Sequence, residues 1–177
     1  MTMCTLWQKL GFKSQFWETG IIRHQSAGIY RMMLLYLYQG DIKMVKMPAE
    51  VRETLEKQKP VPIATASRSG MPNVVFVGLL KIIDDETIMI ADNFFYKTAQ
   101  NLAENPKISI LCYNGETKKS FQIKGNVKVT KEGPDFDAMR SWVHGINNKL
   151  PAKSCVVVKI TEIYNAMWGP AAGKQVA

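Results

Sequence analysis

From residue 47 onward the chain alternates short apolar runs with polar turns, a pattern typical of a protein built mainly of strands. Six runs combine the length and β-branched composition of strands with turn residues at their ends. They cover residues 61–68, 72–83, 87–92, 107–114, 120–130 and 154–168. The longest run, 72–83, ends at an acidic turn of residues 84–86. In the fifth run, Gly125 predicts a bulge or a bend.

Three segments have features of helices instead. Residues 48–58 begin with a proline and carry acidic residues early, with Lys57 late and Lys59 just beyond, and so match the helix dipole. Residues 96–104 end before Asn105-Pro106, because the residue preceding a proline disfavours the helical conformation. Residues 133–146 place an apolar stripe on one helical face, consisting of Phe136, Met139, Val143 and Ile146. Six strands joined mostly by turns, with few short helices, predict a mainly β fold, an antiparallel barrel.

Residues 1–43 differ from the rest, since they are rich in Trp, Tyr and Met and show no clean period. We interpret them as an N-terminal extension and residues 44–177 as the domain. One interpretation of residues 6–17 is an amphipathic helix at a membrane surface. The favoured interpretation is that translation starts at Met44, because codons for Gly40-Asp41 can form a ribosome-binding string. The extension would then not be native, and residues 1–35 are expected to pack poorly against the domain.

Length and composition fit one globular domain, with 177 residues of which 46% are hydrophobic. The formal net charge of +8 raises the question of nucleic acid, but the charge is spread along the chain. The densest basic group consists of Lys118, Lys119, Lys124 and Lys128. At alternate positions of a strand such residues usually form a solvated face, and RNA-binding aromatic motifs and zinc-finger spacings are absent. Nucleic-acid binding is therefore disfavoured.

The three cysteines, Cys4, Cys112 and Cys155, form no pair motif. Cys112 and Cys155 lie in apolar runs and are predicted to be buried thiols, which favours a reducing, cytoplasmic compartment. The two histidines, His24 and His144, stand alone, so the sequence shows no metal-ligand cluster. The longest apolar run near the N-terminus is well short of the roughly 20 residues that span a membrane.

Residues 88–113 predict a strand, a helix and a second strand, with Lys97 and Thr98 at the helix start. A helix start offers free N–H groups and a partial positive charge, so it can hold an anion. The lysine adds a full charge and the threonine a hydroxyl donor. The alternative is an ordinary surface helix with a solvated lysine and a threonine that bonds back to a carbonyl.

Five motifs occur in a regular order: IATASRSGMPNVV, KIIDDETIMIADNFF, KTAQNLAENPKISI, FQIKGNVKV and EGPDFDAM. Together they resemble the FMN-binding split-barrel family related to pyridoxamine 5'-phosphate oxidase, and most of all its small FMN-binding proteins. The resemblance covers residues 48–163 and leaves out residues 1–43. It implies a six-stranded antiparallel Greek-key split barrel, a homodimer, and FMN bound in a groove at the dimer interface.

The resemblance also implies roles for individual residues. Lys97 and Thr98 match the pair that binds the FMN phosphate. Candidates for contacts with the flavin ring, through backbone groups and side chains, are Val75, Phe76 and Val77. Candidates that border the ribityl chain or the ring are Ala91, Asp92 and Asn93. Weaker candidates for side-chain hydrogen bonds are Thr65 and Gln122.

Each of these assignments has a structural alternative. Val75 and Val77 can instead face the core, and Asp92 or Asn93 can instead cap the helix. Two tryptophans, Trp142 and Trp168, can cover the ring from the facing subunit, although burial as structural aromatics is the favoured explanation.

The chain departs from true pyridoxamine phosphate oxidases in two ways. Its final segment, WGPAAGKQVA, contains one lysine and no arginine, and the phosphate segment lacks their Ser-Arg-Lys cluster. Oxidation of vitamin B6 is therefore not expected. No protein nucleophile or general-base dyad is evident, so the flavin would carry hydride or single-electron transfer.

The electron donor and acceptor stay open, with a nicotinamide nucleotide or a small redox protein both compatible with the sequence. A catalyst and a passive FMN carrier are equally compatible. The alternative from another class is a non-flavin barrel that binds nucleic acid through its basic strand face, Lys118 to Lys128.

Overall fold

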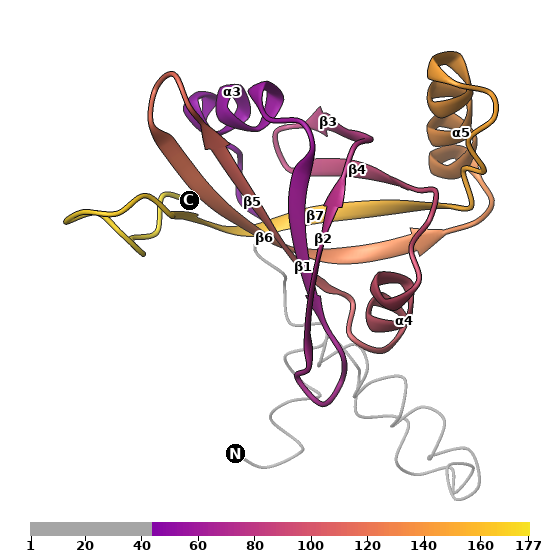
Figure 1. Ribbon diagram of the computed structural model, residues 1–177, viewed down its shortest axis with the longest axis horizontal. Helices are drawn as coiled ribbons and strands as arrows, with labels where there is room; N and C mark the ends of the chain where they lie inside the picture. The colour runs from indigo at the N-terminus through magenta and orange to yellow at the C-terminus, as the bar shows by residue number, and fades with distance from the viewer. Residues whose placement is uncertain (1–43) are drawn as a thin grey trace, which may run out of the picture. The chain divides into compact units, whose positions relative to one another are not determined.

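The computed structural model describes residues 44–177, which belong to one compact unit. The interpretations of residues 1–43, and those of Cys4 and His24, lie outside these residues. Figure 1 shows the described elements. In chain order they are α3 (Ala49–Lys57), β1 (Val61–Ala66), β2 (Pro72–Val77), β3 (Leu80–Asp84), β4 (Thr87–Asp92), α4 (Lys97–Glu104), β5 (Lys107–Asn114), β6 (Lys119–Thr130), α5 (Pro134–Ile146) and β7 (Ser154–Asn165).

The strands form one antiparallel sheet in the order β2-β1-β5-β6-β7-β4-β3. Its inner face and α3 enclose the main core, where branched aliphatic side chains such as Ile63, Ile110, Ile123 and Val158 are at most 1% exposed. These residues alternate with partly exposed or exposed ones along β1 and β5, as the two-residue period of a strand requires. The predicted class, a mainly β antiparallel split barrel, is confirmed.

The predicted count of six strands is wrong, because the run over residues 72–83 forms two strands. β2 ends at Val77 and β3 begins at Leu80, and the two pair with different neighbours, β1 and β4. Between them Gly78 and Leu79 leave the ladder, and the Leu79 carbonyl accepts a hydrogen bond from the Ala91 N–H at 3.1 Å. The apolar run is continuous, but the strand partners change in its middle, so the sheet has seven strands.

The bend predicted at Gly125 is confirmed, since the register of β6 against β7 shifts between Lys124 and Gly125. A Cβ atom at this glycine would lie 2.6 Å from the Lys159 carbonyl oxygen and 2.6 Å from Cγ1 of Val158. Both distances are shorter than any ordinary carbon contact, so the close approach of the two strands requires glycine.

A second, smaller core lies where α5 covers β4 and the start of β7 (Figure 1). Met139 and Val143 are fully buried there, and Phe136 packs against the same cluster. The fourth residue of the predicted stripe, Ile146, is 58% exposed, so that part of the prediction is wrong. Ile146 is the last residue of α5 and belongs to neither core cluster.

Cys112 and Cys155 are both buried, as predicted. Burial raises the pKa of the Cys112 thiol to about 12 and that of Cys155 to about 11, so both stay protonated near neutral pH. Over residues 44–177, no helix is long and apolar enough to cross a membrane.

Candidate functional site

The start of α4 follows directly from the buried strand β4, through the turn Asn93–Tyr96. Lys97 is the first residue of the helix and is exposed. The N-cap position is occupied by Tyr96, and no side chain caps the helix there. The first N–H groups of α4 therefore lack an intrahelical partner and, with the lysine ammonium, provide donors for an anion.

The side chain of Thr98 points inward rather than toward solvent, since the residue is 1% exposed. Its hydroxyl oxygen accepts a hydrogen bond from Nδ2 of Asn73 at 3.0 Å. The same amide donates to the Thr65 hydroxyl at 3.2 Å, and so does Nδ2 of Asn101 at 3.2 Å. Thr65 and Thr98, predicted separately, thus meet in one polar cluster. Sequence reasoning missed the two asparagines that join them, although Asn73 is a polar residue within strand β2 and Asn101 a polar residue within helix α4.

The three β2 candidates do not share a face, because side chains alternate along a strand. Val77 is 5% exposed in the main core, and Val75 packs partly against it. Phe76 points to the opposite, outer face and is 69% exposed. The two valines therefore match the structural alternative, although Val75 is only partly buried, and Phe76 is the most exposed side chain of the three.

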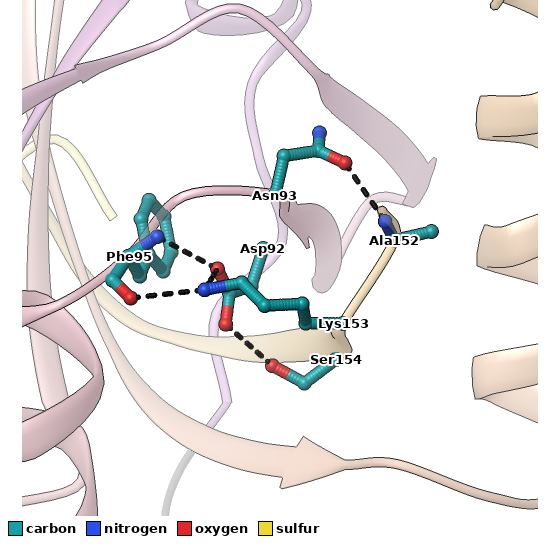
Figure 2. A network of polar contacts seen from close by, with 6 residues as sticks. All are labelled: Asp92, Asn93, Phe95, Ala152, Lys153 and Ser154. Carbon is teal, nitrogen blue, oxygen red and sulfur yellow. Dashed lines mark hydrogen bonds and ion pairs between the residues drawn. The ribbon is translucent and has the colours of Figure 1, made fainter. Parts of the chain in front are cut away.

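Asp92, at the end of β4, is buried at 5% exposure and closes the turn before α4 (Figure 2). Its Oδ1 accepts the Phe95 N–H at 2.8 Å, and its Oδ2 accepts the Ser154 hydroxyl at 3.0 Å. The ammonium of Lys153 lies 3.5 Å from Oδ1 and donates to the Phe95 carbonyl at 3.1 Å. Asp92 therefore fixes the turn that leads into the helix.

Asn93 and Ala91 also stabilise the connection between β4 and α4. Oδ1 of Asn93 accepts the Ala152 N–H at 3.0 Å (Figure 2). The Asp92 carbonyl accepts the Lys153 N–H at 2.8 Å. Ala91 is buried in the smaller core under α5. The turn before α4 is thus fastened to residues 152–154, which sequence reasoning missed because they lie about sixty positions further along the chain.

Gln122 lies away from the polar cluster. It is partly exposed on β6, where it is registered with Leu111 of β5 and Tyr164 of β7. These residues occupy the outer face of the sheet, whereas Thr65 is buried on the inner side. The structure does not bring Gln122 and Thr65 together.

The lysines predicted to form one basic strand face pair with carboxylates. Lys119 pairs with Glu50 at 2.8 Å, and Lys124 pairs with Glu162 at 3.4 Å. A hydrogen bond from the Tyr164 hydroxyl, together with Lys124, lowers the pKa of the Glu162 carboxyl. Lys119 lies on the same side of β6 as the buried Phe121 and Ile123, whereas Lys124 lies on the opposite side. The predicted single basic face is therefore wrong, which leaves the nucleic-acid alternative without support.

The two tryptophans differ. Trp142 packs partly against the smaller core, with the Lys81 ammonium 5.9 Å from its ring centroid. Trp168 is 82% exposed in a single copy of the chain, so the favoured prediction that it is buried as a structural aromatic is wrong. No group of three or more metal-ligating side chains occurs among residues 44–177.

Comparisons of the sequence and of the fold with known proteins identify the family of this chain. The sequence model of the family described as pyridoxamine 5'-phosphate oxidase matches residues 47–166. The uncharacterised protein MJ0282 of Methanocaldococcus jannaschii is 40% identical over 143 residues, which cover 80% of this chain and 94% of that protein. Pyridoxine/pyridoxamine 5'-phosphate oxidase of Nostoc sp. is 32% identical over 89 residues, covering 48% of this chain but only 41% of that enzyme.

Solved structures agree on the fold. An FMN-binding protein from Syntrophomonas wolfei superposes with a TM-score of 0.58 at 22% identity, covering 81% of this chain and 99% of that one. HutZ, the haem storage protein of Vibrio cholerae, gives a TM-score of 0.50 at 15% identity, covering 70% of this chain and 97% of that one. At these identities the likeness is one of fold. Because the family model spans most of the domain and MJ0282 is similar over nearly its whole length, the chain belongs to the pyridoxamine 5'-phosphate oxidase family of split barrels.

Proposed function

We propose that this protein is a flavoprotein that binds FMN and transfers electrons, as an oxidoreductase or as an electron carrier. The observation that carries the proposal is the start of α4, where an exposed lysine stands at a helix start that no side chain caps. A lysine ammonium, free backbone N–H groups and the positive end of a helix dipole together provide the donors and charge that bind a phosphate monoester dianion. Family membership and the FMN-binding protein of similar fold support FMN as that ligand.

In this proposal Lys97 binds the FMN phosphate with its ammonium group. Thr98 contributes chiefly its backbone N–H, because Asn73 holds its side chain inside. The buried end of β4, Ala91 and Asp92, together with the turn residue Asn93, fixes the direction from which the helix meets the ligand. FMN, when bound, supplies hydride or single-electron transfer, while the protein sets its orientation and exposure.

We extend the proposal to a homodimer that encloses the flavin. The outer face of β2 and β5 carries large exposed apolar side chains, namely Val74 (67%), Phe76 (69%), Leu111 (42%) and Tyr113 (40%). Strand β1 lies between these two strands, so the side chains occupy one side of a continuous sheet. Such faces on soluble proteins mark interaction sites, and a second copy of the chain is the partner that the family membership favours.

The purified protein is expected to be yellow and to release about one FMN per chain when it is denatured. The measurement is the absorbance spectrum of the native protein, followed by chromatography of the released cofactor. Colourless protein that cannot be reconstituted with FMN would exclude the flavin proposal. Bound riboflavin in place of FMN would exclude a phosphate site at Lys97. A haem absorbance spectrum would instead favour haem as the ligand, as in the haem storage protein of similar fold.

The protein is also expected to have twice the 20.0 kDa mass of one chain when measured by light scattering. Phe76→Lys places a charge in the middle of the exposed apolar face and should produce monomers. The matched control is Ile83→Lys, which changes an exposed isoleucine (47%) on β3 and should leave the dimer intact. A monomeric wild type that binds FMN tightly would contradict the proposed interface.

A further inference from the structure

The carboxylate of Asp92 poses a problem for the proposed phosphate site. It accepts the Phe95 N–H at 2.8 Å, and Phe95 lies two residues before Lys97. Since a chain spans at most about 3.6 Å per residue, the carboxylate lies within about 10 Å of the first N–H of α4. A negative charge so close to a dianion opposes its binding, and burial of the carboxylate limits screening by water and salt.

The structure offsets this charge locally (Figure 2). The ammonium of Lys153 lies 3.5 Å from Oδ1 of Asp92, and Ser154 donates to Oδ2 at 3.0 Å. Lys153 also donates to the Phe95 carbonyl at 3.1 Å, so its charge sits on the same turn as the carboxylate. The Lys153 side chain is 45% exposed, whereas that of Asp92 is 7% exposed. The surface lysine therefore neutralises a buried carboxylate directly behind the helix start.

We infer that Lys153 is a positioning and charge-compensating residue for the anion at the start of α4, and that it acts through Asp92 rather than by touching the phosphate. The inference rests on the proposed function, because it concerns the same FMN phosphate. It names a residue of the loop between α5 and β7 as a determinant of affinity for phosphorylated over unphosphorylated flavin. Asp92 supplies the rigid turn, and Lys153 removes the electrostatic penalty that this turn would otherwise impose.

The test compares FMN with riboflavin, which lacks the phosphate. Lys153→Met retains the apolar stem but removes the charge, and Asp92 keeps its bonds to Phe95 and Ser154. This variant is expected to bind FMN about fivefold to hundredfold more weakly, with riboflavin nearly unchanged. Fluorescence titrations of both flavins give the two affinities, and the riboflavin arm shows that the variant is folded.

The double variant Asp92→Asn with Lys153→Met distinguishes the two possible modes of action. Asparagine keeps an oxygen acceptor for the Phe95 N–H, and the carboxylate charge is gone. It is compared with Asp92→Asn alone, because loss of the carboxylate charge by itself favours a dianion. If Lys153 acts through Asp92, adding Lys153→Met to Asp92→Asn leaves the FMN affinity nearly unchanged. If Lys153 contacts the phosphate itself, Lys153→Met weakens FMN binding in the Asp92→Asn protein as much as in the wild type, and the inference is overturned.

Lys149→Met is the matched control, since it removes one exposed lysine from the same loop. It should leave the affinity for both flavins unchanged. If Lys149→Met weakens FMN binding as much as Lys153→Met does, the loss reflects only the lower net charge of the protein, and the inference is overturned. Equal losses of FMN and riboflavin in Lys153→Met would assign the residue to fold stability alone. A wild type that binds neither flavin would overturn the proposed function itself. A wild type that binds FMN, with Lys153→Met unchanged, would overturn only the inference about Lys153.

Discussion

Lys97→Ala is expected to weaken FMN binding by about tenfold to hundredfold and to leave riboflavin binding nearly unchanged. The two ligands differ by the phosphate, and Lys97 is the exposed cation at the uncapped start of α4. A hydrogen bond to a charged group contributes roughly 1.5–3 kcal/mol, and a tenfold change in affinity corresponds to about 1.4 kcal/mol. The loss should shrink as salt rises, because an exposed charge is screened.

The measurement is a pair of fluorescence titrations, one for each flavin, with the wild type and the variant. Thr98→Val should have a smaller effect on FMN, since its hydroxyl is engaged with Asn73 inside the protein. Equal losses of both flavins in Lys97→Ala would assign the lysine to the fold or to the ring site. No loss of either would make Lys97 a solvated surface residue.

Gly125→Ala is expected to destabilise the folded protein by about 1–3 kcal/mol, the usual cost of forcing an extra carbon into a packed region. The new Cβ would lie 2.6 Å from the Lys159 carbonyl oxygen, which belongs to the backbone of β7 and cannot turn aside. The strands β6 and β7 must therefore separate where their register shifts. For a protein of this size the melting temperature should fall by about 2–4 °C for each kcal/mol.

Thermal unfolding followed by circular dichroism measures the effect. The control is Gly145→Ala, because no atom beyond the local backbone of α5 and the two neighbouring residues lies within 4 Å of the Cβ position of this glycine. Alanine favours the helical conformation over glycine by roughly 0.5–1 kcal/mol, so this control should be neutral or slightly stabilising. A Gly125→Ala protein as stable as the wild type would show that the close approach of β6 and β7 is not required.

Local pattern predicted most of the fold because each element carries its own signal. The bend at Gly125 is marked by a glycine inside a strand, and the end of α4 by a proline. The break in residues 72–83 also lies at a glycine, Gly78, but that glycine does not show that the two halves of the run pair with different strands. Periodicity reports which faces are buried and says nothing about strand partners.

The candidate site was predictable where its residues are neighbours in the sequence. Lys97 and Thr98 were recognisable because they share one helix start. The residues that support this helix start were not recognisable. Asn73 reaches Thr98 from strand β2, and Lys153 reaches Asp92 from about sixty residues further along the chain. A run such as Val75–Val77 is apolar throughout, so the sequence cannot say which side chains face outward. Contacts between residues far apart in the sequence, and the face on which each side chain lies, could be seen only in the structure.

The place of β7 in the sheet has a consequence for how the protein is made. This strand, Ser154–Asn165, is the last strand along the described chain, yet it lies between β6 and β4. Until it has been synthesised, the strands can pair only as β2-β1-β5-β6 and, separately, β4-β3. Because translation proceeds from the N-terminus at about 5–20 residues per second, the nascent chain carries two incomplete sheets with unpaired edges. Only the emergence of β7 joins them, so the nascent chain is exposed to aggregation until that strand has been synthesised.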